Sequence, residues 1–187
     1  MTLPRLLLLT DAGQLPAGRD LVGAVAACVA AGLRAVVVRE HRLPPAERRD
    51  LVAALADLPA LTVISSRIAD PSAHGVQLAA GQPAPARGMW GRSCHGASEV
   101  DRARVDGAAY ATLSPYAASA SKPGYGPPID PSAYAGHAIP VYALGGIDVH
   151  NAAAARAAGA HGVAVMGAAM RAADPAAVVA AILREVR

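Results

Sequence analysis

Short apolar runs alternate with longer segments of helical character along the whole chain, and this alternation repeats eight times without a break. The runs are Leu6–Leu9, Arg34–Val38, Leu61–Ile64, Gly75–Leu78, Met89–His95, Ala108–Leu113, Ile139–Leu144 and Gly162–Met166. Strands that alternate with helices form a parallel sheet, whose strands are covered on both faces and are therefore apolar at their centres. Eight such units are the number that closes a barrel. The sequence therefore predicts an α/β fold, a single compact (β/α)8 TIM barrel that occupies residues 1–187 as one domain.

The length restricts how complete the barrel can be. A TIM barrel typically needs about 250 residues, and this chain has 187. We therefore expect one or two shortened helices, after the third and fourth strands. An open doubly wound sheet is the competing architecture, and it is weakened because no Gly-rich dinucleotide-binding turn follows the first strand.

Composition and charge narrow the classes of partner. Apolar residues make up 53% of the chain without any Phe, so small aliphatic side chains must pack helices directly on strands. The net charge is only +3, and we interpret Arg42, Arg48 and Arg49 as a solvated helix face rather than a nucleic-acid patch. Leu6–Leu9 is too short to span a membrane. Two cysteines without a paired framework favour a reducing cytoplasm, and a homodimer is left open as the oligomeric state.

Glycines follow the last two predicted strands, at the end of the barrel where active sites lie. Gly145 and Gly146 come after one strand, and Gly167 comes after the next. Glycine lets the backbone approach an anion and direct its N–H groups at it. We therefore expect a phosphate site between these two turns, with charged contacts from Arg39 and from Lys122 in the long loop.

The segment Gly91–His95 carries the candidate for chemistry. Side chains alternate along a strand, so Ser93 and His95 point into the pocket while Cys94 points into the helix layer. An imidazole titrates near neutral pH and can act as a general acid or base. We therefore predict that His95 transfers a proton and that Cys94 is not a nucleophile.

These motifs together resemble one known family. The chain resembles the thiamine phosphate synthase superfamily nearly end to end, and within it looks more like the thiazole tautomerase branch. The resemblance rests on Thr10-Asp11, Val38-Arg39-Glu40, Gly75-Val76-Gln77-Leu78, Gly91 to His95, Ser114-Pro115, Ser119, Ser121-Lys122, Ala143 to Ile147, and Val163 to Met166.

The resemblance implies a barrel that binds a small molecule, a phosphorylated thiazole, and it assigns residues to the phosphate and to the rest of the substrate. The phosphate would lie on backbone around Gly145, Gly146, Met166 and Gly167. The substrate would contact Arg39, Glu40, Ser93, Ser119, Ser121 and Lys122. His41 stands where the synthase commonly has Lys.

Departures from the synthase pattern favour the other branch. The synthase holds Mg²⁺ on an Asn-Asp pair that appears here as Ser65-Ser66, and no Asp or Glu occurs between Asp70 and Glu99 to supply its second metal ligand. Mg²⁺ usually needs one or two carboxylates. We therefore expect an isomerase, a thiazole tautomerase in thiamine biosynthesis without metal or other cofactor, with His95 as its catalytic residue.

Two alternatives stay open from the sequence. A thiamine phosphate synthase, a transferase that joins thiazole phosphate to hydroxymethylpyrimidine pyrophosphate, would use Mg²⁺. A barrel that binds a thiamine-related phosphate without turnover is the third possibility.

Overall fold

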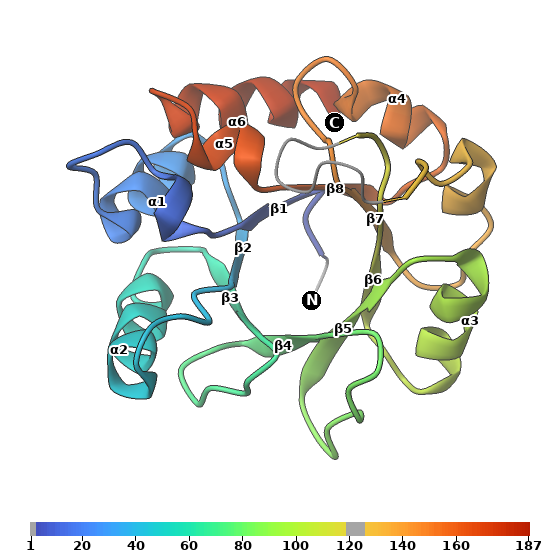
Figure 1. Ribbon diagram of the computed structural model, residues 1–187, viewed down its shortest axis with the longest axis horizontal. Helices are drawn as coiled ribbons and strands as arrows, with labels where there is room; N and C mark the ends of the chain where they lie inside the picture. Colours follow the sequence, from blue (N-terminus) through green and yellow to red (C-terminus); the bar gives the residue numbers. More distant parts are fainter. Residues whose placement is uncertain (1–2, 119–125) are drawn as a thin grey trace.

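The fold is a closed parallel barrel. The computed structural model describes residues 3–118 and 126–187, in which eight strands pair in sequence order and β8 pairs with β1 (Figure 1). The strands are β1 (Leu6–Leu9), β2 (Ala35–Val38), β3 (Thr62–Ser66), β4 (Gly75–Leu78), β5 (Met89–Cys94), β6 (Tyr110–Leu113), β7 (Val141–Leu144) and β8 (Gly162–Val165). The predicted fold class and strand order are confirmed.

Helices cover the outside of this ring (Figure 1). They are α1 (Leu21–Ala30), α2 (Pro45–Ala56), α3 (Ala97–Val105), α4 (Ala152–Ala157), α5 (Gly167–Met170) and α6 (Pro175–Glu185), with 3₁₀ turns η1 (Ala12–Gln14) and η2 (Pro131–Tyr134). Aspartates begin two of the α-helices, α1 and α6: Asp20 accepts from the N–H of Gly23 at 2.8 Å, and Asp174 accepts from that of Ala177 at 3.0 Å. Each carboxylate satisfies an otherwise unpaired N–H of the first turn.

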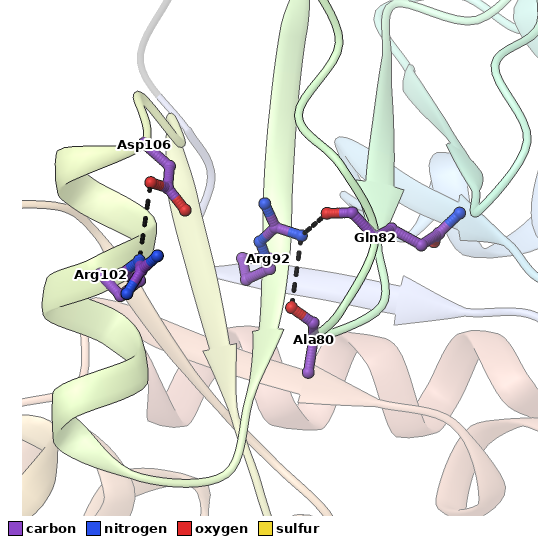
Figure 2. Close-up of polar contacts among 5 residues, drawn as sticks. All are labelled: Ala80, Gln82, Arg92, Arg102 and Asp106. Carbon is purple, nitrogen blue, oxygen red and sulfur yellow. Dashed lines mark hydrogen bonds and ion pairs between the residues drawn. The ribbon is translucent and has the colours of Figure 1, made fainter.

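Within the described ranges, helices are missing after the third and fourth strands, where the sequence predicted shortened ones. Among the described residues, no helix lies between β3 and β4 or between β4 and β5, and only η2 lies between β6 and β7. Arg92 on β5 organises the connection after β4 by donating to the carbonyl oxygens of Ala80 and Gln82 (Figure 2) and also to that of Ala79. Its guanidinium also lies 4.8 Å from the ring centroid of Trp90. One arginine thus anchors the loop that replaces a helix.

The core has two layers divided by the strands. Alternate strand residues fill the barrel interior: Leu7, Leu9, Ala35, Val37, Ile64, Tyr110, Tyr142 and Ala164. The opposite faces pack against the helices. Tyr110 and Tyr142 meet edge to face inside the barrel, with centroids 5.7 Å apart. Gly91 leaves room for them, because a side chain there would collide with the Tyr110 ring.

One sequence expectation fails in the helix layer. Arg42 and Arg49 are exposed as predicted, but Arg48 on α2 is only 4% exposed. Its guanidinium donates to the carbonyl of Val38 at 3.2 Å, the hydroxyl of Ser65 at 2.9 Å and the carbonyl of Ser66 at 3.1 Å. The prediction of a solvated face is wrong for Arg48, because α2 places this side chain over the ends of β2 and β3, where three oxygen atoms accept hydrogen bonds from it.

The helices of the described ranges are all too short or too polar to cross a lipid bilayer.

Candidate functional site

The carboxyl ends of all eight strands meet at one rim, which we call the mouth of the barrel. Ser93 faces the interior, where its hydroxyl accepts from the Gln77 amide at 3.0 Å. His95 is exposed at the rim, with Nδ1 3.0 Å from the carbonyl oxygen of Ser114. Cys94 is fully buried in the helix layer, and burial raises the pKa of its thiol to about 12, with Glu99 adding to the rise. Ser93 and Cys94 face opposite sides of the strand, as predicted, whereas the predicted orientation of His95 into the pocket stays a prediction because β5 ends at Cys94.

The turn after β7 requires its two glycines. Gly145 and Gly146 have φ angles of 92° and 67°, in the left-handed region that other residues rarely adopt. A Cβ on Gly146 would lie 2.5 Å from the carbonyl oxygen of Ala118. The turn is therefore built against the loop after β6, and the N–H of Ala117 donates to the carbonyl of Gly145 at 3.0 Å.

Two guanidinium groups flank the turn after β8. Arg39, from the end of β2, donates to Sδ of Met166. Arg171 lies against Gly167, where any side chain would collide with its guanidinium, and it donates to Gln14 at 2.6 Å. We call Arg39, Met166, Gly167 and Arg171 the β8 cradle. Sequence reasoning missed Arg171; its only signal is a position four residues after Gly167, which stacks the two on one helix face.

The residues beside Arg39 hold the β1 loop in place. The N–H of Arg39 donates to Oγ1 of Thr10 at 2.9 Å. Both carboxylate oxygens of Glu40 accept from the N–H of Ala12, at 3.1 and 3.2 Å. Glu40 therefore lies beside the β1 loop and braces the wall of the mouth that carries Arg39. Its assignment to substrate binding stays a prediction.

A second group of basic side chains lies where the ends of β2 and β3 meet. The hydroxyl of Ser66 is 3.4 Å from Nε2 of His41. Partial burial lowers the pKa of His41 to about 4, and the positive charges of Arg67, Arg39 and Arg48 lower it further in that order. We call His41, Arg48, Ser66 and Arg67 the β2–β3 cluster. Arg39 contributes charge to this cluster and a contact to the β8 cradle.

At the positions where the resemblance predicts metal ligands, the structure has groups that accept hydrogen bonds from arginine. The hydroxyl of Ser65 accepts from Arg48 and donates to the carbonyl of Ile68. After β4, the backbone carbonyls of Ala79 and Ala80 accept from Arg92. Within residues 3–118 and 126–187, no three His, Cys, Asp or Glu side chains come together as a metal site. These positions do not fit Mg²⁺, although the expectation that no cofactor is used stays a prediction.

Three predicted substrate contacts lie outside the residues that the structure describes: Ser119, Ser121 and Lys122.

Comparison with known proteins shows what this barrel is similar to. Residues 6–169 match the family model described as thiamine monophosphate synthase. A protein of Geobacter sulfurreducens, provisionally named a thiamine-phosphate synthase, is 36% identical over 91% of this chain and 88% of its own length. The thiamine-phosphate synthase of Moorella thermoacetica is 35% identical over 92% of this chain and 91% of its own.

A solved structure agrees at the level of the fold. The thiamine phosphate pyrophosphorylase of Pyrococcus furiosus superposes with a TM-score of 0.83 at 22% identity, over 97% of this chain and 95% of that one.

These relatives contradict the expectation of a thiazole tautomerase. They are named as synthases, which are transferases, and none of the findings supports an isomerase. The expectation failed because it assumed that a site without carboxylates to bind Mg²⁺ could not stabilise a diphosphate leaving group. Guanidinium groups, which the sequence did not reveal as neighbours, lie in that part of the mouth.

Proposed function

Because the chain belongs to the thiamine monophosphate synthase family, we propose that it is a thiamine-phosphate synthase, a transferase that joins thiazole phosphate to hydroxymethylpyrimidine pyrophosphate. The reaction breaks the bond between the pyrimidine methylene carbon and a diphosphate oxygen, and it forms a bond from that carbon to the thiazole nitrogen. Diphosphate leaves with the electrons of the broken bond. Such a reaction requires one mouth to hold two separate anions.

The observation that carries this proposal is the presence of two groups of cations at one mouth, with Arg39 between them. The β8 cradle has Arg39 and Arg171 around a glycine turn. In the β2–β3 cluster, Arg48 donates to Ser65 and Ser66, His41 lies beside the Ser66 hydroxyl, and Arg67 follows Ser66 along the chain. An isomerase acting on one phosphorylated thiazole would need only one of these groups, whereas the synthase reaction needs both.

We assign the thiazole phosphate to the β8 cradle. The glycines at positions 145, 146 and 167 let the backbone approach the anion, and Arg39 and Arg171 can each donate charge-assisted hydrogen bonds to phosphate oxygens. The diphosphate then lies over the β2–β3 cluster, where fixed positive charge stabilises the negative charge that develops on the leaving group.

His95 takes a different role from the one first expected. No proton leaves the thiazole nitrogen when it attacks carbon, so this reaction does not need a base at the rim. We propose that His95, held beside Ser114 at 3.0 Å, and Ser93, held by Gln77 at 3.0 Å, line the part of the mouth that receives the two rings.

The setting we propose is a reducing cytoplasm, since both Cys28 and Cys94 are free and buried.

The direct experiment incubates the protein with both substrates and measures thiamine phosphate and pyrophosphate by mass spectrometry. We expect both products in equal amounts, and neither product when one substrate is omitted. A known thiamine-phosphate synthase in parallel reactions checks the substrates. If that control forms product and this protein forms none, with or without Mg²⁺, the proposal is wrong.

A further inference from the structure

Arginine side chains gather where the ends of β2 and β3 meet, at the positions for which the resemblance predicted metal ligands. Resting on the proposed function, we propose that the β2–β3 cluster binds the diphosphate of the pyrimidine substrate directly, without a metal ion, and that Arg67 is a residue that contacts it.

The side chains of the cluster suit an anion better than a metal ion. Ser65 and Ser66 stand where the synthase has its Asn-Asp pair, and a neutral hydroxyl is a weak substitute for a carboxylate as a Mg²⁺ ligand. The Ser65 hydroxyl is already engaged by Arg48. A guanidinium bound to this ligand position repels a divalent cation and attracts an anion.

Arg48 carries a buried positive charge. Arg48 is 4% exposed, and among the described residues no carboxylate forms an ion pair with it. Its Nε is buried with no hydrogen-bond partner in this part of the chain. A buried cation is costly unless it is paired. A bound diphosphate would supply the missing negative charge, so Arg48 acts as a positioning residue that holds Ser65 and the end of β3.

The backbone at Arg67 has an unusual conformation. This residue has a φ of 65°, which is unusual outside glycine. The strain is maintained from both sides, because its N–H donates to the carbonyl of Gln77 at 2.7 Å and its carbonyl accepts from the Gln82 amide at 3.0 Å. Strained backbone that the surrounding structure holds in place is typical of functional sites.

Positively charged side chains are crowded together in the cluster. Arg67, Arg39 and Arg48 all lie close enough to lower the pKa of His41, and Ser66 is the polar neighbour of its ring. Glu40, the carboxylate next to Arg39, is oriented toward the N–H of Ala12 on the β1 loop. An anion with several oxygens would relieve this mutual repulsion, and diphosphate is the substrate group with that charge and shape.

The test is calorimetric titration of the whole protein with inorganic pyrophosphate in the presence of EDTA. We expect binding by the wild type and no tightening when EDTA is replaced by Mg²⁺. Arg67→Gln should weaken binding about 10- to 100-fold, the range for loss of a hydrogen bond between charged groups. Arg49→Gln is the matched control: it removes the same charge from the exposed face of α2 and should change binding by less than about twofold.

A second pair of variants reinstates the family's charge. Ser66→Asp puts a carboxylate into the cluster and should weaken binding in EDTA by about tenfold or more, while Ser66→Asn, of similar size but neutral, should retain most of it. Binding that appears only with Mg²⁺, or that survives both Arg67→Gln and Ser66→Asp unchanged, overturns the inference.

The two proposals fail in distinguishable ways. Coupling activity together with strictly Mg²⁺-dependent pyrophosphate binding keeps the synthase assignment and overturns the metal-free site. Metal-free pyrophosphate binding that depends on Arg67, without product from the two substrates, keeps the anion site and overturns the synthase assignment.

Discussion

The guanidinium of Arg48 donates to the hydroxyl of Ser65 at 2.9 Å, across the interface between α2 and β3. The same group also donates to the carbonyls of Val38 and Ser66. One buried side chain therefore secures the ends of two neighbouring strands, at the place where the mouth carries its second group of cations.

Replacing Arg48 should destabilise the fold. Arg48→Ala removes the hydrogen bonds from the guanidinium to the carbonyls of Val38 and Ser66 and to the hydroxyl of Ser65, at about 0.5–1.5 kcal/mol for each bond. We expect a loss of roughly 2–5 kcal/mol in the free energy of unfolding, measured by urea denaturation. Arg49→Ala, one residue along on the exposed face, should change stability by less than about 0.5 kcal/mol. Equal effects of the two substitutions would contradict the role assigned to Arg48.

The β7 turn should reject any side chain at its second glycine. Gly146→Ala combines a positive φ with a Cβ 2.5 Å from the Ala118 oxygen. Gly136→Ala meets a similar φ of 79° but has no atom within 4 Å of the added Cβ. Both should lose the roughly 1–2 kcal/mol of a left-handed residue, and Gly146→Ala should lose at least about 1 kcal/mol more from overpacking. Thermal unfolding of the pair measures the difference, and equal losses would show that the turn is not packed as described.

His41 gives the protein a defined response to acid. Its pKa is about 4 in the folded protein, below the value of about 6.5 for an unfolded chain. The unfolded state therefore takes up more protons between these values, so stability associated with neutral His41 is complete above about pH 6.5 and is lost as pH falls toward 4.

Nuclear magnetic resonance can follow this imidazole directly. We expect the His41 ring to stay neutral between about pH 5 and 8 in the free protein, and to titrate within this range once pyrophosphate is added, because a nearby anion raises the pKa. His41→Gln should also reduce the loss of stability on going from pH 7 to 5. A His41 resonance that titrates near pH 6.5 without ligand would contradict the cationic surroundings described here.

The two thiols should be inert in the native protein. Burial raises the pKa of Cys28 to about 11 and that of Cys94 to about 12, and only a thiolate reacts readily. A thiol reagent at pH 8 should label neither cysteine until denaturant is added, and Cys94→Ala should keep full coupling activity. Rapid labelling of the folded protein, or loss of activity in that variant, would make Cys94 a candidate nucleophile after all.

The fold was predictable because its signals are local. Apolar runs such as Leu6–Leu9 identify strands, and Asp20 and Asp174 identify helix starts by residues within one turn of the cap. Even the missing helices after β3 and β4 follow from the short spacing between consecutive strands.

The composition of the site was predictable only in part. Arg39, Gly145, Gly146 and Gly167 follow strands directly, and the barrel brings such residues to one rim. Arg48 looked like one more charged residue on a helix, and nothing in its neighbours along the chain indicates that α2 covers the end of β3. Arg67 and Arg171 are significant only through contacts with distant segments. The tautomerase reaction was therefore chosen wrongly. The absence of carboxylates can be read from the sequence, whereas the presence of arginines in the same region of the fold cannot.

The most direct test of two separate anion sites is steady-state kinetics of the coupling reaction with each substrate varied in turn. Arg171→Gln should raise the KM for thiazole phosphate about tenfold or more and leave that for the pyrimidine pyrophosphate within about twofold, and Arg67→Gln should do the reverse. If both variants raise the KM of the same substrate, or neither changes either value, the mouth does not hold its two anions in the way described here.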